Sequence, residues 1–245
     1  MVHHPPKRVV VAVDFGEASG AAVAFAGRIA ARFGSTLVAV HADTFEVPPY
    51  FTREQLELIE QEVRTARLKA EAELRAFVAQ RTSLPVEVRV SEQPAVDAVL
   101  GAARDADLIV MGTHGRRGPK RWWLGSVAER VIREAAVPVL VAHASAGAAT
   151  SQTARLDAVL VGVHETGPEA RSWADVLATA FDGTVREGPT VDQCAGGAGV
   201  AATSVVIVPV PARPASRTVH DAVVALARTC TVPVLFVPTS EARTR

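Results

Sequence analysis

Short, continuous runs of apolar residues alternate with helical patterns along this chain, and no other feature of the sequence restricts its fold as strongly. Residues 8–13 (Arg-Val-Val-Val-Ala-Val) and 108–111 (Leu-Ile-Val-Met) are typical of strands buried on both faces. Three further runs occupy residues 36–41, 86–90 and 138–141. Strands that alternate with helices join through right-handed crossovers into a parallel sheet that helices cover on both sides. The sequence therefore predicts an α/β fold with an open, doubly wound parallel sheet.

Helical patterns fill the intervals between these runs. Residues 17–33 are rich in alanine and end at Gly34, a common helix stop. Residues 52–81 place apolar side chains at steps of three and four and charges elsewhere, which predicts a long amphipathic helix against the sheet. Shorter helices are expected at residues 94–104 and 126–135.

The second half of the chain repeats this order in a shorter form. Val-Pro-Val-Leu-Val at residues 137–141 returns as Val-Pro-Val-Leu-Phe-Val at residues 232–237. Before the second copy, strands are expected at 156–163 and 204–208, and helices at 167–181 and 220–229. Small and polar residues at 143–152 are typical of a linker. The repeat predicts tandem domains, with a first domain at residues 1–146, a linker at 147–155, and a shorter, degenerate domain at 156–245.

Glycines break the chain directly after the fourth apolar run. Gly112, Gly115 and Gly118 follow it, and Gly125-Ser126 opens the next helix. Glycines let bare backbone N–H groups approach an anion, and the first turn of a helix adds unpaired N–H groups and partial positive charge. We therefore expect a phosphate-binding loop in which Ser126 adds a hydroxyl donor. Its spacing matches neither the P-loop nor the GxGxxG dinucleotide fingerprint.

The spacing Gly112, two residues, Gly115, nine residues, Gly125-Ser126 resembles the nucleotide-binding signature of the universal stress protein family, in its ATP-binding branch. The tail after this signature, to residue 141, and the opening strand with Asp14 resemble that family as well. The resemblance runs from residue 8 to about 143 and rests on three separated motifs in the same order. It implies that strands one and four are neighbours, so that Asp14 and Gly112 face each other across a crevice at the strand ends.

The resemblance also implies roles for individual residues around the nucleotide. Asp14 would accept hydrogen bonds from ribose hydroxyls or an adenine amine, although a carboxylate there also suits the cap of the helix that begins at Glu17. Ala42 falls where the family contacts adenine through the backbone. Met111 and Val127 would flank the nucleotide, with packing in the apolar core as the alternative.

Arg116 lies inside the glycine loop together with Arg117, Lys120 and Arg121. One or two of these cations could reach phosphate oxygens through charge-assisted hydrogen bonds. A solvated loop is the alternative. The cofactor expected from the resemblance is ATP, or AMP or ADP, with Mg²⁺ held through the phosphates and not by a protein metal site.

The second half has lost the features that would hold a phosphate. His164 stands where the first half has Asp14, and residues 209–214 (Pro-Val-Pro-Ala-Arg-Pro) replace the glycine loop. Prolines lack the N–H donor, and Asp221, expected as the N-cap of the following helix, would repel a phosphate. Nucleotide is therefore expected in the first domain only.

The second domain is expected to pair with the first. The strands that follow Pro138 and Pro233 would meet edge to edge, as family members pair in dimers, and this pairing would cover two edges that invite aggregation. A homodimer and an unidentified protein partner are further expectations.

Charge and composition exclude other classes of function. The 26 basic and 26 acidic residues cancel, whereas a protein whose main partner is nucleic acid usually carries a basic excess. No apolar run is long enough to span a bilayer and no signal peptide precedes Arg8, so no membrane partner is expected. Cys194 and Cys230 do not form a disulfide framework, which suits a reducing compartment and predicts a cytoplasmic location.

These observations favour an ATP-binding protein with a regulatory role in the stress response. The sequence contains no nucleophile–base pair and no metal-ligand spacing, and His41 is interpreted as a packed strand-end residue, so no catalytic residue is predicted. Slow ATP hydrolysis is one alternative, because bound phosphate and metal can be enough for weak turnover. A protein-interaction scaffold without nucleotide turnover is the other.

Overall fold

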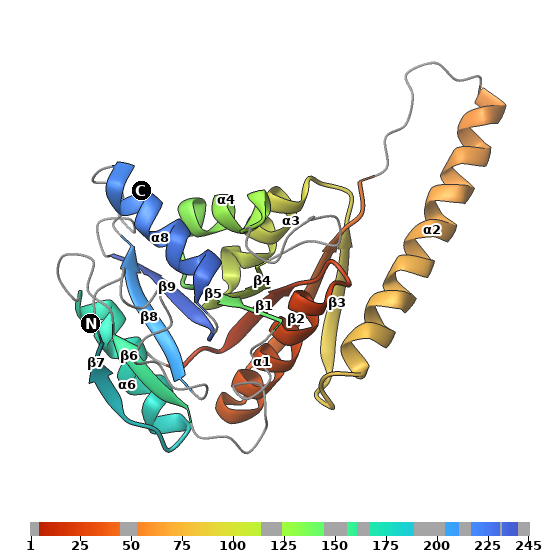
Figure 1. Ribbon diagram of the computed structural model, residues 1–245. Coiled ribbons are helices and arrows are strands. Elements are labelled where there is room, and N and C mark those ends of the chain that lie inside the picture. The colour runs from red at the N-terminus through yellow and green to blue at the C-terminus, as the bar shows by residue number, and fades with distance from the viewer. Residues whose placement is uncertain are drawn as a thin grey trace.

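The structure is a computed structural model that describes residues 5–44, 53–113, 124–144, 156–160, 167–188, 204–210, 217–230 and 232–239. In the first half, strands and helices alternate along the chain (Figure 1). Their bounds are β1 (Arg8–Ala12), α1 (Glu17–Phe33), β2 (Thr36–Ala42), α2 (Arg53–Ala79), β3 (Val86–Ser91), α3 (Ala95–Ala102), the 3-10 turn η1 (Ala103–Asp105), β4 (Leu108–Gly112), α4 (Ser126–Glu134) and β5 (Val139–Ala142). Apart from η1, the sequence predicted each of these elements to within two residues at either end.

The second half has the same alternation of strands and helices. Its described elements are β6 (Asp157–Leu160), α6 (Pro168–Ala180), β7 (Val185–Glu187), β8 (Ser204–Val210), α8 (Arg217–Thr229) and β9 (Val234–Pro238). Strand β7 was not predicted, because the three residues Val-Arg-Glu carry too little pattern to be recognised as a strand.

Within the described ranges, nine strands form one sheet in the order β3-β2-β1-β4-β5-β9-β8-β6-β7. All neighbours are parallel except β5 and β9, which are antiparallel and place Val139 opposite Phe236 and Val141 opposite Val234. Each half thus supplies a parallel sheet, and the two sheets meet at the edges that the proline-led strands were expected to share. The predicted α/β fold with two tandem, doubly wound parallel sheets is confirmed.

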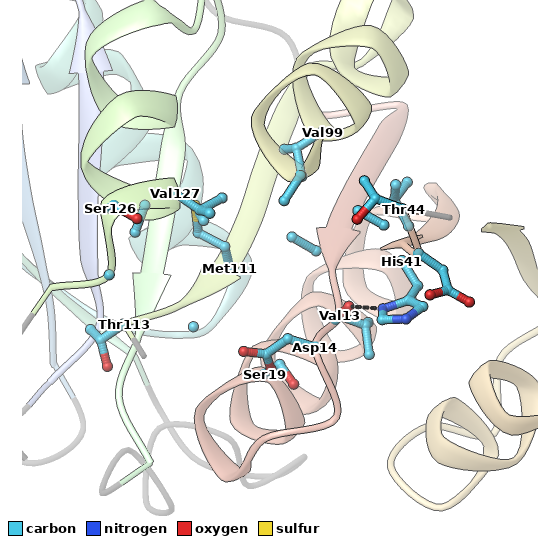
Figure 2. A pocket seen from close by; sticks show the side chains of 18 residues that line it. Val13, Asp14, Ser19, His41, Thr44, Val99, Met111, Thr113, Ser126 and Val127 are labelled. Carbon is cyan, nitrogen blue, oxygen red and sulfur yellow. Dashed lines mark hydrogen bonds between the residues drawn. The ribbon is translucent and has the colours of Figure 1, made fainter. Parts of the chain in front are cut away.

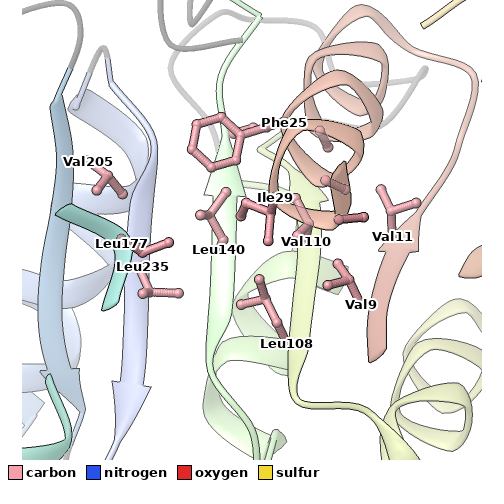
Figure 3. Packing of buried hydrophobic residues seen from close by; sticks show 14 of the residues in the cluster. Val9, Val11, Phe25, Ile29, Leu108, Val110, Leu140, Leu177, Val205 and Leu235 are labelled. Atoms are coloured by element: carbon pink, nitrogen blue, oxygen red, sulfur yellow. The ribbon is translucent and has the colours of Figure 1, made fainter. Parts of the chain in front are cut away.

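Apolar side chains pack on both faces of the sheet, because successive residues of a strand point to opposite sides. Val9 and Val11 belong to the cluster that includes α1, α2 and α6, whereas Val10 belongs to the one with α3, α4 and α8. The first cluster crosses the β5–β9 seam, where Leu140 and Leu235 are fully buried (Figure 3). Burial of a leucine contributes about 1.5–3 kcal/mol, so core packing supports the seam in addition to its backbone hydrogen bonds.

Strand β8 does not end at Val208, as predicted, but continues through Pro209 to Val210. The N–H of Val206 and the C=O of Val210 bond toward β9. Because alternate residues of a strand bond to opposite neighbours, Pro209 faces β6, whose described pairing ends opposite Ile207. The missing N–H of the proline therefore points away from β9, and the described pairing with β9 continues through Pro209 to Val210.

Helix α8 begins at Arg217, three residues before the predicted start. Asp221 is the fifth residue of the helix and is exposed, so its predicted role as the N-cap was wrong. The sequence did contain a signal for this start, because Ser216, a residue type favoured at the N-cap, directly precedes Arg217. His164 and residues 211–216 lie outside the described part of the chain.

Helix α2 is as long as predicted, but only its C-terminal half packs on the sheet. Ala70, Leu74 and Val78 are buried, whereas Ala66 is exposed, and Figure 1 shows the N-terminal half projecting beyond β3. The periodicity therefore predicted a helix correctly but not how much of it the domain covers. No described helix, α2 included, is both long enough and apolar enough to cross a bilayer.

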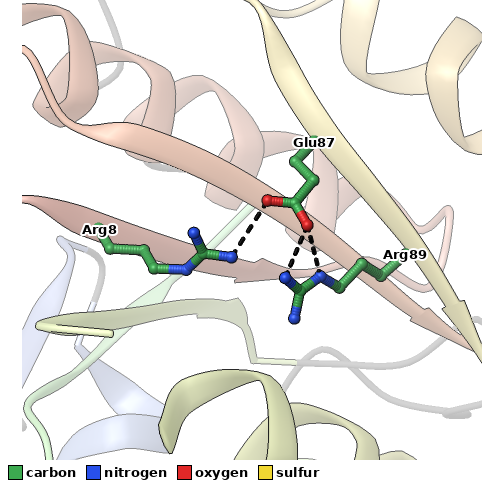
Figure 4. Close-up of polar contacts among 3 residues, drawn as sticks. All are labelled: Arg8, Glu87 and Arg89. Carbon is green, nitrogen blue, oxygen red and sulfur yellow. Dashed lines mark hydrogen bonds and ion pairs between the residues drawn. The ribbon is translucent and has the colours of Figure 1, made fainter. Parts of the chain in front are cut away.

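An ion-pair group links β1 and β3 across β2, on the face opposite α1 (Figure 4). Arg8 of β1 donates from Nη2 to Oε2 of Glu87 at 3.1 Å, and Arg89 donates from Nε to Oε1 of the same carboxylate at 2.7 Å. The hydrogen bond from Arg89 is the main reason that the pKa of Glu87 lies below its ordinary value, with smaller contributions from the charges of Arg89 and Arg8.

We expect Glu87→Gln to reduce the pH dependence of stability. A depressed folded-state pKa contributes stability above the unfolded pKa, and this contribution is lost as pH falls through the folded pKa. The carboxylate is partly exposed, so its contribution at neutral pH should stay below about 1 kcal/mol. Urea unfolding from neutral to acid pH measures it: wild type and Glu87→Gln should converge at low pH, whereas the exposed-site control Glu73→Gln should stay parallel to wild type. Parallel curves for Glu87→Gln would contradict the prediction.

Candidate functional site

A pocket of about 700 Å³ lies at the carboxyl ends of β1, β2 and β4. Strands β1 and β4 are neighbours although they are far apart in sequence, and here the strand order reverses, as expected. Doubly wound sheets bind ligands at such a reversal, and the volume is within the range of small-molecule sites. The structure brings together seven of the nine residues expected at the site (Figure 2), namely Asp14, Ala42, Met111, Gly112, Gly125, Ser126 and Val127. Gly115 and Arg116 lie outside the described residues.

Asp14 follows β1 and is fixed by a turn at the pocket wall. Its Oδ1 accepts a hydrogen bond from the N–H of Gly16 at 3.0 Å, and the hydroxyl of Ser19 donates to the C=O of Gly16 at 3.0 Å. The N-cap residue of α1 is Gly16, and no side chain makes a capping hydrogen bond to the first turn of this helix. Asp14 therefore does not cap α1. The alternative role for Asp14 is thus not supported, and the carboxylate has capacity for a ligand beyond its bond to Gly16.

Phe15, between Asp14 and Gly16, has a left-handed backbone with φ of 64°. This conformation costs a residue with a β-carbon roughly 1–2 kcal/mol. The ring of Phe15 lies 4.6 Å from the ring of His41 and 5.3 Å from that of Phe77, centroid to centroid. Aromatic pairs contribute about 0.5–1.5 kcal/mol each beyond burial, so these contacts are of the right size to offset the backbone cost.

His41 is a packed residue at the end of β2, as interpreted from the sequence. Its Nδ1 lies 2.8 Å from the C=O of Val13. A carbonyl only accepts, so Nδ1 carries the proton. The side chain thereby links the ends of β1 and β2 at the pocket wall.

Gly112 is a glycine because α1 leaves no space for a side chain. A Cβ at this position would lie 2.7 Å from the C of Ala18 and 2.7 Å from the N of Ser19, both backbone atoms. The first turn of α1 therefore rests directly on the end of β4. The sequence suggested that Gly112 serves the phosphate, whereas the structure gives it a packing role that also brings α1 to the pocket.

Gly125 closes the base of the glycine loop. Its N–H donates to the C=O of Thr113 at 2.8 Å, and the N–H of Thr113 donates to the C=O of Ala142 at 3.1 Å. The N–H of Gly125 is thus already used. The first helical bond of α4 runs from Glu129 to Gly125, so the donors without an intrahelical partner belong to residues 126–128, all of which line the pocket.

Ala42 directs its backbone into the pocket. The C=O of Val40 accepts from the N–H of Val13 at 2.8 Å, which places the bonds of Val40 on the β1 side. Alternate residues of a parallel strand bond to the same neighbour, so Ala42 also faces the β1 side. The pairing of β1 with β2 ends opposite Val40. Ala42 therefore presents an N–H and a C=O, side by side, beyond the end of β1.

The charge of the described wall is negative. Among the eighteen residues that line the pocket, the carboxylates are Asp14 and Asp43, and none is lysine or arginine. The described residues contain no group of three or more His, Cys, Asp or Glu side chains that could hold a metal ion. The basic residues expected near the phosphates, from Arg116 to Arg121, lie outside the described ranges.

Several lining residues were not predicted from the sequence. Asp43, Thr44 and Thr113 directly follow β2 and β4, so their positions after strands could have indicated them. Ser19 and Val99 lie on helices α1 and α3, and they reach the pocket only because those helices cross the strand ends. No sequence signal marks such a contact.

A family model described as the universal stress protein family matches residues 5–143, more than half of the chain. The chain therefore belongs to the universal stress protein family. A universal stress protein of Mycobacterium tuberculosis is 35% identical over 147 residues, which are 58% of this chain and 46% of that protein. Another, from Methanocaldococcus jannaschii, is 31% identical over 140 residues, 55% of this chain and 81% of that protein.

The chain spans about half the length of the mycobacterial relatives that it matches. A solved universal stress protein from Archaeoglobus fulgidus aligns with 95% of this chain and 96% of its own, with a TM-score of 0.62 and 13% identity. This likeness of fold extends over the second half, past the end of the family match at residue 143.

Proposed function

We propose that the first domain, residues 1–146, binds ATP, or ADP or AMP, with Mg²⁺ on the phosphates, and that this binding serves a regulatory role in the stress response. The observation that carries the proposal is the pocket at the β1–β4 reversal, where the free backbone of Ala42, the carboxylate of Asp14 and the start of α4 lie around one space. The backbone of Ala42 would bind the base, Asp14 the sugar, and the start of α4 the phosphates.

The wall around Ala42 suits an adenine ring. The Watson–Crick edge of adenine offers an amine donor beside a nitrogen acceptor, which complements a backbone C=O beside an N–H. Guanine presents the reverse order of acceptor and donor. Val99, Met111 and Val127 supply apolar surface for the faces of the ring.

The start of α4 suits a phosphate chain. The N–H groups of residues 126–128 and the partial positive charge of the helix start attract anions. Asp14 and Asp43 would repel phosphates unless a cation lies between them, which supports a requirement for Mg²⁺. The phosphates would hold the ion, whose charge would screen them from the two carboxylates, so the protein needs no metal site of its own.

We assign no nucleotide to the second domain, residues 156–245. Strand β8 corresponds to β4, but where β4 ends at a glycine, β8 continues through Pro209. The second domain instead contributes β9, which covers the edge of β5. We propose that the second domain serves to pair with the nucleotide-binding half.

Calorimetric titration of the full chain with ATP tests the proposal. ATP with Mg²⁺ should bind, removal of Mg²⁺ with a chelator should weaken binding, and GTP should bind at least about tenfold more weakly because its base edge leaves the Ala42 groups unpaired. Asp14→Asn should raise the Kd for ATP about tenfold. It keeps one acceptor oxygen for Gly16 but loses the charge and the second acceptor oxygen, whereas Asp14→Ala loses both oxygens and the charge and should bind at least as weakly.

The matched control is Asp221→Asn, which removes an exposed carboxylate from α8 in the second half. Its Kd for ATP should equal that of the wild type. If no adenine nucleotide binds to the wild type with Mg²⁺ present, the proposed function is wrong.

A further inference from the structure

We propose that Phe15 is a positioning residue for the ligand, and that its ring holds the carboxylate of Asp14 in the pocket. This inference rests on the proposed function, because it concerns the same site. Phe15 itself does not appear among the residues that line the pocket, although both Asp14 and His41 do. Any effect of its side chain on a ligand must therefore pass through a neighbour.

The backbone of Phe15 determines where Asp14 points. With φ at 64°, Phe15 turns the chain back so that the N–H of Gly16 reaches Oδ1 of Asp14 at 3.0 Å. With φ in the ordinary negative region the chain would leave β1 in another direction, and this hydrogen bond would be lost. A left-handed phenylalanine persists only where its surroundings hold it.

Two rings from different elements hold the side chain of Phe15. One is His41 of β2, tilted by 60° and itself fixed by the C=O of Val13. The other is Phe77 of α2, edge to face at 88°. Phe77 is covered in turn by the guanidinium of Arg81 at 3.5 Å from the ring centroid.

The turn that presents Asp14 is thus anchored to β2 and to the C-terminal half of α2. When the ring is removed, the turn can relax to an ordinary conformation, and Asp14 leaves its position in the pocket. A residue that only filled the core would lower stability without this effect on the ligand. The two roles differ in how a change at Phe15 combines with a change at Asp14.

A double-mutant cycle on the full chain separates these roles, with ATP and Mg²⁺ as the probe and calorimetry as the readout. Asp14→Ala and Phe15→Ala should each raise the Kd about tenfold. The double variant should bind no more weakly than Asp14→Ala alone, because the ring acts only through that carboxylate. Phe15→Gly lacks the ring but adopts φ of 64° without strain, so it should keep part of the affinity that Phe15→Ala loses.

Phe33→Ala is the matched control. Phe33 is also half-buried and has one edge-to-face partner, Phe181 at 6.2 Å, but it lies at the far end of α1. It should lower the melting temperature and leave the Kd unchanged. Losses at Asp14 and Phe15 that simply multiply, wild-type affinity in Phe15→Ala, or a Phe15→Gly variant that binds no better than Phe15→Ala would overturn the inference. A wild type that binds no nucleotide would instead overturn the proposed function, so the two failures are distinguishable.

Discussion

Gly112→Ala is expected to lower the free energy of unfolding by roughly 1–3 kcal/mol and to weaken ATP binding by at least about tenfold in the same variant. The new Cβ would lie 2.7 Å from two backbone atoms of α1, in Ala18 and Ser19. Backbone atoms cannot rotate away as a side chain can, so α1 must move off β4. Asp14 and Ser19 are attached to that end of α1 and would move with it.

The two effects have separate measurements, urea unfolding for stability and calorimetry for the Kd. Gly101→Ala is the control, since a Cβ there has no atom within 4 Å and the residue lies in α3. Alanine favours a helix over glycine by about 1 kcal/mol, so this variant should be as stable as wild type or more stable. Gly112→Ala with wild-type stability would show that α1 and β4 are not in the contact described.

Gly183→Ala is expected to destabilise the second half by about 3 kcal/mol. Gly183 lies in the turn between α6 and β7, where a Cβ would overlap the backbone C=O oxygen of Leu156. Leu156 directly precedes β6, and its N–H is bonded to Phe181 at 3.4 Å. The substitution therefore separates the turn from the start of β6, and the strand cannot keep its place between β7 and β8.

Thermal unfolding measures this loss, and ATP titration tests where it acts. Because we assign the nucleotide to the first half, the folded variant should bind ATP with wild-type Kd at a temperature well below its transition. Gly167→Ala is the control: its Cβ would meet a flexible carboxylate oxygen of Glu169 at 3.4 Å and the Cγ2 of Thr239 at 3.9 Å, both at ordinary contact distance. It should lower stability by about 1 kcal/mol at most, through a poorer N-cap. Equal losses in the two variants would contradict the contact at Leu156.

The sequence predicted the elements of the first half well because their patterns are local. Residues such as Val9, Val10 and Val11 are buried on both faces, and a strand of this kind is recognisable without knowledge of its neighbours. The adjacency of β1 and β4 was predicted from the resemblance to a family, because the sequences of the two strands do not indicate which strands are neighbours. The position of Asp14 at a strand end could be predicted as well, because Asp14 directly follows this apolar run.

What the sequence could not predict depends on contacts between distant segments. Gly112 was predicted to serve phosphate binding, because nothing in the neighbouring sequence indicates that α1 packs against this residue. Pro209 was placed in a loop because only the sheet shows that β8 continues past Val208 and pairs there with β9. The left-handed Phe15 is equally invisible, since the rings that hold it come from β2 and α2.

The antiparallel junction of β5 and β9 has a consequence for how the two halves can communicate. The described strands of the first half all run one way across the sheet, and those of the second half run the opposite way. The first half therefore opens its crevice on one rim of the molecule, and the corresponding strand ends of the second half lie on the other rim. A single small molecule cannot touch both, so any signal between them has to travel through the shared strands and the helices packed across them.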